Sequence, residues 1–80
     1  MKAVKKPRAA ASFVVEFDRE EDGRWIAEVP KLPGVMAYGS TRAEAQRKVH
    51  AIALRTLASK VEDGANPAPV ARLFYAVANR

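Results

Sequence analysis

The chain has 80 residues, with 14 Lys and Arg against 9 Asp and Glu, which gives a net charge of +5 and a pI near 10.0. A chain this short removes only about 60% of its unfolded surface from water, so we expect one small domain that gains burial by association rather than an enzyme with a deep pocket. The absence of cysteine excludes a disulfide framework, a thiolate metal site and a thiol nucleophile. No apolar run approaches the ~20 residues that cross a bilayer, so the expected compartment is the cytoplasm.

The basic excess is concentrated at the N-terminus. Residues 1–11 contain four basic residues and no acid, and these are Lys2, Lys5, Lys6 and Arg8. Residues 12–63 contain nine acids and eight bases and are nearly neutral. We therefore expect a flexible basic leader over 1–11 and a folded domain over 12–80. Such a leader can hold nucleic acid through its phosphates, and a merely solubilising terminus is the alternative.

Residues 12–18 predict the first strand, because their apolar residues fall on alternate positions. Phe13, Val15 and Phe17 share one face, and the other face carries Ser12, Val14, Glu16 and Asp18. The acidic stretch that follows ends in Asp22-Gly23, which supplies the positive-φ positions of a tight hairpin turn.

Residues 24–29 predict the return strand, with Trp25, Ala27 and Val29 on one face and Ile26 and Glu28 on the other. Pro30, Pro33 and Gly34 end this strand in a rigid turn. Residues 35–38 then form a third short strand, which Gly39 closes.

The next segment carries a helix-start signal. Thr41 and Glu44 fit a capping box, and no Pro or Gly occurs between them and Glu62. Gly64 is available to end the helix in a left-handed conformation. The expected buried arc consists of Ala45, Val49, Ile52, Ala53, Thr56 and Leu57, with Leu54 and Val61 widening it; the opposite arc holds Lys48, Arg55, Ser59 and Glu62.

The C-terminal residues 70–77 alternate as a last strand, after a stiff loop at 65–69. The expected fold class is therefore α+β, a two-layer arrangement in the order β-β-β-α-β with one long helix packed on a small antiparallel sheet. The aromatic residues are expected in the core or on a dimer surface rather than as a base-stacking platform, because no basic residues interleave with them on the same face.

The sequence lacks the residue patterns that are typical of catalytic sites and metal sites. The four glycines stand alone and form no phosphate loop, and no serine lies in a nucleophile elbow. His50 is in the middle of the expected helix, where a surface or interface role is favoured over catalysis. The neighbouring acids Glu20, Glu21 and Asp22 are favoured as a solvated turn over a metal site. We therefore expect no enzyme activity, no metal and no cofactor.

Two motifs at fixed spacing link these turns and caps. One follows D-G-x-[WY]-x-A-x-V-P-x-L-P-G over 22–34, and the other follows G-x-T-x-x-E-A over 39–45. Together they resemble the HicB family of antitoxins, and the likeness extends over residues 12 to about 77. The motif residues with an expected structural role are Asp22, Gly23, Pro30, Pro33, Gly34, Gly39, Thr41, Glu44 and Ala45.

The resemblance implies a non-enzymatic protein that binds and occludes a HicA-type toxin, an RNA-cleaving enzyme with a double-stranded-RNA-binding-like fold. It also implies a homodimer or larger homo-oligomer. Many family members carry a C-terminal DNA-binding domain, but this chain ends at Arg80, directly after the expected last strand. DNA binding by that route is therefore not expected, and the compartment remains the cytoplasm.

A toxin that grips RNA is basic, so acidic residues of the first hairpin are the expected contact surface. The hypothesised partner-binding residues are Glu16, Asp18, Glu20, Glu21, Asp22, Trp25 and Glu28, and a solvated hairpin is the alternative. A second functional hypothesis is an oligomeric module that holds nucleic acid through the leader together with Arg42, Arg47, Lys48 and Arg55 of the helix.

Overall fold

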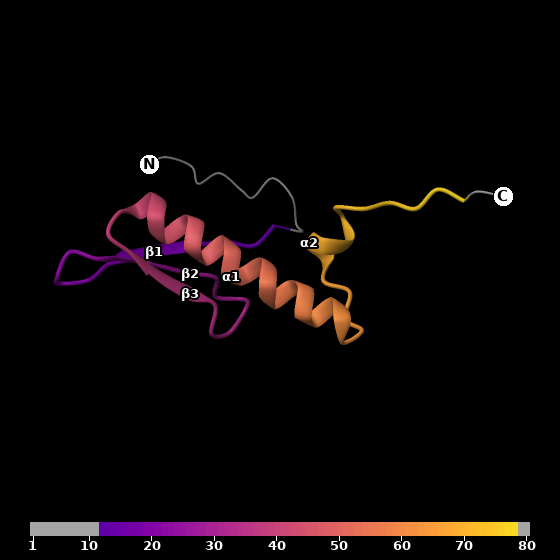
Figure 1. Ribbon diagram of the computed structural model, residues 1–80, viewed down its shortest axis with the longest axis horizontal. Helices are drawn as coiled ribbons and strands as arrows, with labels where there is room; N and C mark the ends of the chain where they lie inside the picture. The colour runs from indigo at the N-terminus through magenta and orange to yellow at the C-terminus, as the bar shows by residue number, and fades with distance from the viewer. Residues whose placement is uncertain (1–11, 79–80) are drawn as a thin grey trace, which may run out of the picture.

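A computed structural model describes residues 12–78 of the chain. The elements follow one another as β1 (Glu16–Arg19), β2 (Trp25–Glu28), β3 (Met36–Gly39), α1 (Arg42–Glu62) and α2 (Ala68–Ala71). The three strands form one antiparallel sheet in the order β1-β2-β3. The long helix α1 lies across one face of this sheet, as Figure 1 shows, which confirms the α+β class and the two layers. The expected leader, residues 1–11, lies outside the described part of the chain.

The first hairpin is closed by a loop one residue longer than the tight turn expected from Asp22-Gly23. The Gly23 N–H donates to the Glu20 carbonyl, and the Glu20 N–H donates to the Arg24 carbonyl. Gly23 alone has a positive φ here, at 93°. These bonds describe a three-residue loop that ends in a left-handed glycine. The expectation of positive φ at Asp22 is therefore wrong, because the turn needs only one left-handed residue.

The second connection consists of two successive turns, as its prolines and glycine predict. The Leu32 N–H donates to the Val29 carbonyl, and the Val35 N–H donates to the Leu32 carbonyl. Pro33 and Gly34 occupy the centre of the second turn, where Gly34 has a φ of 85°, the conformation that a type II turn requires. Leu32 is buried between the two turns and anchors them to the core.

Helix α1 begins and ends with the expected caps. The Glu44 N–H donates to the Thr41 hydroxyl at 3.0 Å, and the Glu44 carboxylate accepts from the Ser40 N–H at 2.7 Å. At the other end the Gly64 N–H donates to the Val61 carbonyl and the Ala65 N–H to the Lys60 carbonyl. This pair of bonds, with Gly64 at a φ of 101°, is the Schellman arrangement that satisfies the last carbonyls of a helix.

The core lies between α1 and the sheet. Its buried side chains come from β2 and its end, from the turn, from β3 and from α1; they are Ala27, Val29, Leu32, Val35, Ala37, Ala45, Val49 and Leu57. Gly39 matters for this packing, because an added Cβ there would lie 2.5 Å from the backbone nitrogen of Ala45. The first turn of α1 therefore rests directly on the end of β3. Leu54 and Val61, which were expected to widen the apolar stripe, remain exposed.

No strand follows the helix among the described residues, so the expected strand over 70–77 is wrong. Residues 68–71 form the short helix α2 instead, in which the Ala71 N–H donates to the Pro67 carbonyl. Pro69 lies in its first turn, where a missing N–H costs nothing. This turn leads the following residues away from the sheet (Figure 1), and alternation alone does not supply a strand partner.

Candidate functional site

The face of the sheet that α1 leaves uncovered carries both acidic and apolar side chains. Strand alternation places Glu16 and Asp18 of β1, Ile26 and Glu28 of β2, and Met36 and Tyr38 of β3 on this side. We call these six residues, together with Val14 before β1, the open face. Met36 is 39% exposed and Tyr38 is 41% exposed. The open face thus has carboxylates on β1 and β2 and apolar side chains on β2 and β3.

Two of these carboxylates face each other across the hairpin. Glu16 is the register partner of Glu28, which is in turn the partner of Met36. Side chains in this relation have Cβ atoms about 5 Å apart, and like charges there destabilise the sheet. Among the described residues the ion pairs involve Asp22 with Arg24 and Glu44 with Lys48, and neither of them relieves this pair. Within residues 12–78, no ion pair therefore compensates these two negative charges.

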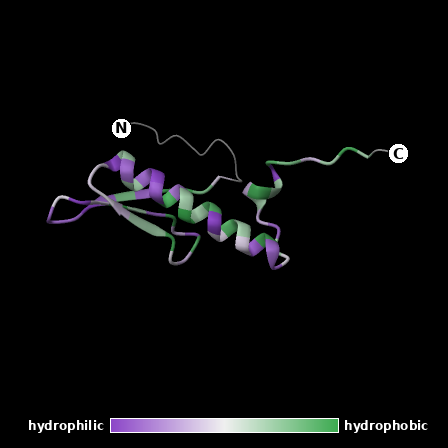
Figure 2. Ribbon diagram, viewed as in Figure 1, coloured by the Kyte–Doolittle hydropathy of each residue, from purple (hydrophilic) through white to green (hydrophobic). Residues whose placement is uncertain are grey.

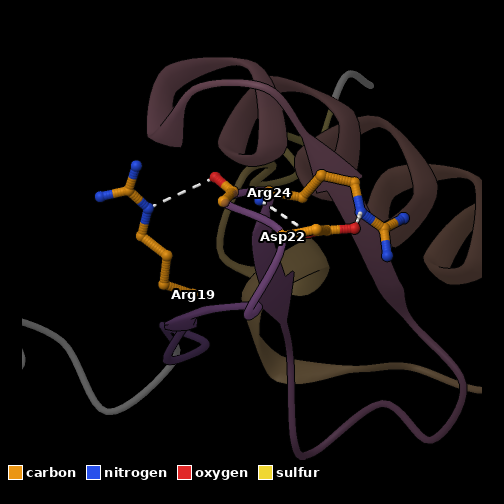
Figure 3. Close-up of polar contacts among 4 residues, drawn as sticks. Arg19, Asp22 and Arg24 are labelled. Atoms are coloured by element: carbon orange, nitrogen blue, oxygen red, sulfur yellow. Dashed lines mark hydrogen bonds and ion pairs between the residues drawn. The ribbon is translucent and has the colours of Figure 1, made fainter.

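The turn beside the open face is held by a small set of polar contacts, shown in Figure 3. Asp22 accepts from the backbone N–H of Arg24 at 3.0 Å and from its guanidinium Nε at 2.8 Å. The backbone hydrogen bond is the main reason why the pKa of Asp22 lies below its usual value. Arg19 donates to the Gly23 carbonyl at 3.3 Å, and the Arg24 guanidinium carbon lies 4.5 Å from the centre of the Tyr38 ring.

These contacts divide the residues that were hypothesised to bind a partner. Glu16, Asp18 and Glu28 share the open face, whereas Trp25 lies on the opposite face with Ala27 and packs against the core. The guanidinium of Arg19 lies 5.0 Å above its ring. Of the remaining acids, Asp22 is paired with Arg24, and Glu20 and Glu21 belong to the turn.

Four open-face residues were not among the hypothesised partner-binding residues, namely Val14, Ile26, Met36 and Tyr38. Their signal was present in the alternation, since Ile26 was placed opposite the buried face of its strand. The same period along 35–38 puts Met36 and Tyr38 outside and Val35 and Ala37 inside, which the burial of these residues shows.

Only the helical residues of the nucleic-acid hypothesis lie in the described part of the chain. Lys2, Lys5, Lys6 and Arg8 lie outside the described residues. On α1, Lys48 is 3.1 Å from the Glu44 carboxylate, and the Arg42 guanidinium lies 4.0 Å from the Phe17 ring centre. Arg47 and Arg55 are exposed. Half of the helical set is thus already engaged by neighbouring side chains.

His50 is exposed on α1 and borders a groove lined otherwise by apolar residues. Among residues 12–78 no three His, Asp or Glu side chains converge on a point where a metal ion would bind. In the same part of the chain, no helix has the length and apolar character needed to cross a bilayer.

Comparison of the chain with family models, curated proteins and solved structures finds no match. The open face therefore has to be interpreted from its own chemistry.

Proposed function

We propose that this chain is a binding protein without enzyme activity, and that its open face holds a basic protein. The observation that carries this proposal is the facing pair Glu16 and Glu28 beside the exposed Met36 and Tyr38. A like-charged pair lowers the stability of the free sheet. A cationic side chain placed between the two carboxylates would remove that repulsion, and the apolar side chains of β3 beside them would contribute buried area.

The same chemistry disfavours nucleic acid on this face, because carboxylates repel phosphates. It also disfavours a small molecule, since the six central residues of the open face belong to strands of a sheet rather than to an enclosed pocket. A protein partner with arginine or lysine near an apolar patch fits best, because opposite charges speed and orient such an encounter.

Within this class we propose the antitoxin of a type II toxin–antitoxin pair, acting in the cytoplasm on a HicA-type RNA-cleaving toxin. The support comes from the two motifs over 22–34 and 39–45, which resemble the HicB family. A toxin that grips RNA needs a basic surface, and an acidic sheet face seated on that surface would exclude the RNA.

Co-expression tests this proposal. The gene adjacent to that of this chain should encode a small basic protein that arrests growth when expressed alone and does so no longer when co-expressed with this chain. A neighbour that is harmless alone, or whose toxicity this chain leaves unchanged, would refute the antitoxin function.

A charge reversal then locates the binding surface. Glu28→Lys should abolish the rescue of growth, whereas Glu62→Lys, an equal change at an exposed position near the end of α1, should preserve it. Rescue by both variants would show that the toxin binds elsewhere on the chain.

A further inference from the structure

The segment that follows α2 exposes more apolar surface than any other stretch of the described chain. Leu73 is 69% exposed, Phe74 71%, Tyr75 89% and Val77 68%. Figure 2 shows this stretch as mainly hydrophobic, and Figure 1 shows it extending away from the sheet and α1. We call residues 73–77 the arm. Its alternating, aromatic-rich sequence is typical of a strand.

Strand β1 provides a free sheet edge with which the arm could pair. This strand is at the edge of the sheet, so its outer N–H and C=O groups have no strand partner among the described residues. Helix α1 packs over β3 and β2 and leaves the helix side of β1 less covered. An apolar groove lies beside the residues that lead into β1, and its walls include Phe13, Val15, Leu54, Leu57 and Val70.

We propose that the arm of one copy adds as a fourth strand to the β1 edge of a second copy, and that the exchange is reciprocal. The arm would complete each sheet by backbone pairing, and its inward side chains would fill the groove beneath Leu54 and Leu57. The proposal goes beyond the binding of a basic partner, because it uses the β1 edge and the groove rather than the open face.

The direction of the chain favours a second copy over the arm's own sheet. Leu73 still borders the groove of its own copy, but the residues after it lead outward (Figure 1). The short helix α2, whose first hydrogen bonds are accepted by the Pro67 carbonyl, sets this direction. Reciprocal exchange about a two-fold axis lets two outward arms satisfy two edges at once.

The buried area also favours a second copy. Aromatic side chains offer about 150–250 Å² each, so the exposed parts of Phe74 and Tyr75, together with Leu73 and Val77, present roughly 500 Å² per arm. Two arms and the surfaces they cover would bury roughly 2,000 Å², which is the size of a stable, specific interface. A single arm on an unrelated protein would bury only about half of that area.

The mass in solution provides the first test. Light scattering and sedimentation of the full chain should give twice the 8.8 kDa chain mass, and the double variant Tyr75→Asp/Val77→Asp should be a folded monomer, with the circular dichroism of the parent. Met36→Asp places the same charge on the open face and should remain dimeric. A monomeric parent, or a dimer that survives the arm substitutions, would overturn the proposal.

Cross-linking distinguishes exchange from an arm that folds back on its own sheet. The chain has no cysteine, so Val14→Cys marks the β1 edge and Ala76→Cys marks the arm. A mixture of the two single variants, treated with a short bismaleimide, should give a covalent dimer that contains one chain of each. The matched mixture of Val14→Cys with Ala58→Cys, an exposed residue of α1, should not.

A Val14→Cys/Ala76→Cys double variant that cross-links only within one chain, while the mixture gives no dimer, would contradict the exchange. These outcomes are separable from the proposed function, because variants of the arm leave Glu16, Glu28 and Met36 unchanged. An antitoxin that proves monomeric would refute the exchange alone, and an exchanged dimer without a toxin would refute the proposed function alone.

Discussion

Replacing Gly39 with alanine tests whether the first turn of α1 rests directly on the end of β3. The added Cβ would lie 2.5 Å from the backbone nitrogen of Ala45 and 3.0 Å from its Cα. A clash with main-chain atoms cannot be relieved by a side-chain rotation, so the start of the helix has to move away from the sheet. That movement would also strain the hydrogen bonds that Thr41 and Glu44 make at the helix start.

The magnitude follows from this geometry. Overpacking typically costs about 1–3 kcal/mol, and we expect Gly39→Ala at the upper end, because the clash involves backbone. A domain of this length has a free energy of unfolding of roughly 4–12 kcal/mol. A loss of about 3 kcal/mol would therefore lower the Tm by roughly 12–24 °C.

Urea titration followed by the fluorescence of Trp25, the only tryptophan, measures this loss at a fixed protein concentration. Gly64→Ala is the matched control, because Gly64 has a φ of 101° and nothing lies within 4 Å of the added Cβ. Its cost is conformational only, about 1–2 kcal/mol. If Gly39→Ala lost no more stability than Gly64→Ala, the reasoning about the helix–sheet contact would be refuted.

The other predictions concern the helix cap and the open face. Thr41→Ala removes the acceptor of the Glu44 N–H and should lower the free energy of unfolding by about 1 kcal/mol in the same titration; an unchanged value would contradict the cap. The pKa of Glu44 lies below its ordinary value of 4.5, chiefly because the Ser40 N–H donates to the carboxylate. A lowered folded pKa contributes stability that is complete above the ordinary pKa and is lost as the pH falls through the folded value. Glu44→Gln should therefore lose less stability than the parent when urea titrations are carried below pH 4.5. An equal loss of the free energy of unfolding in both proteins would contradict the contribution of the Glu44 carboxylate. Glu16→Lys converts the repulsion with Glu28 into attraction and should raise the free energy of unfolding by about 0.5–1 kcal/mol, a gain that high salt should reduce; a loss of stability would argue against the observed register.

The helix and the turns were predictable because their determinants are local. Thr41, Glu44 and Gly64 act within one turn of the chain, and Pro33 with Gly34 sets a turn by backbone preference alone. The number of residues in the loop of the first hairpin could also have been predicted from the sequence. A two-residue loop at 22–23 would pair Glu16 with Val29 and turn the inward residues of the two strands to opposite faces. Only a loop with an odd number of residues keeps both apolar sets on one side, as the pairing of Phe17 with Ala27 shows.

The path of the last segment was not predictable in the same way, and the residues of the open face were predictable only in part. Alternation over 70–77 indicates that one side of the segment is apolar. Pairing with another strand also requires the segment to lie beside the sheet, and α2 turns the chain away from it. Trp25 was grouped with the acids because it is close to them in sequence. Its position two residues before Ala27 in the same strand places both side chains on the face that packs against α1. The facing of Glu16 and Glu28 depends on register, which the length of the loop decides.

The central claim is that the open face binds a basic partner at the expense of the free sheet's stability. The most direct test is the affinity of the purified chain for the proposed toxin, a basic protein expected to be encoded beside it, measured by titration calorimetry for the parent, Glu28→Lys and Glu62→Lys. We predict that Glu28→Lys weakens binding by at least about tenfold, although it stabilises the free chain, and that Glu62→Lys binds as the parent does. Equal affinity for all three proteins, or an equal loss in both variants, would contradict the claim.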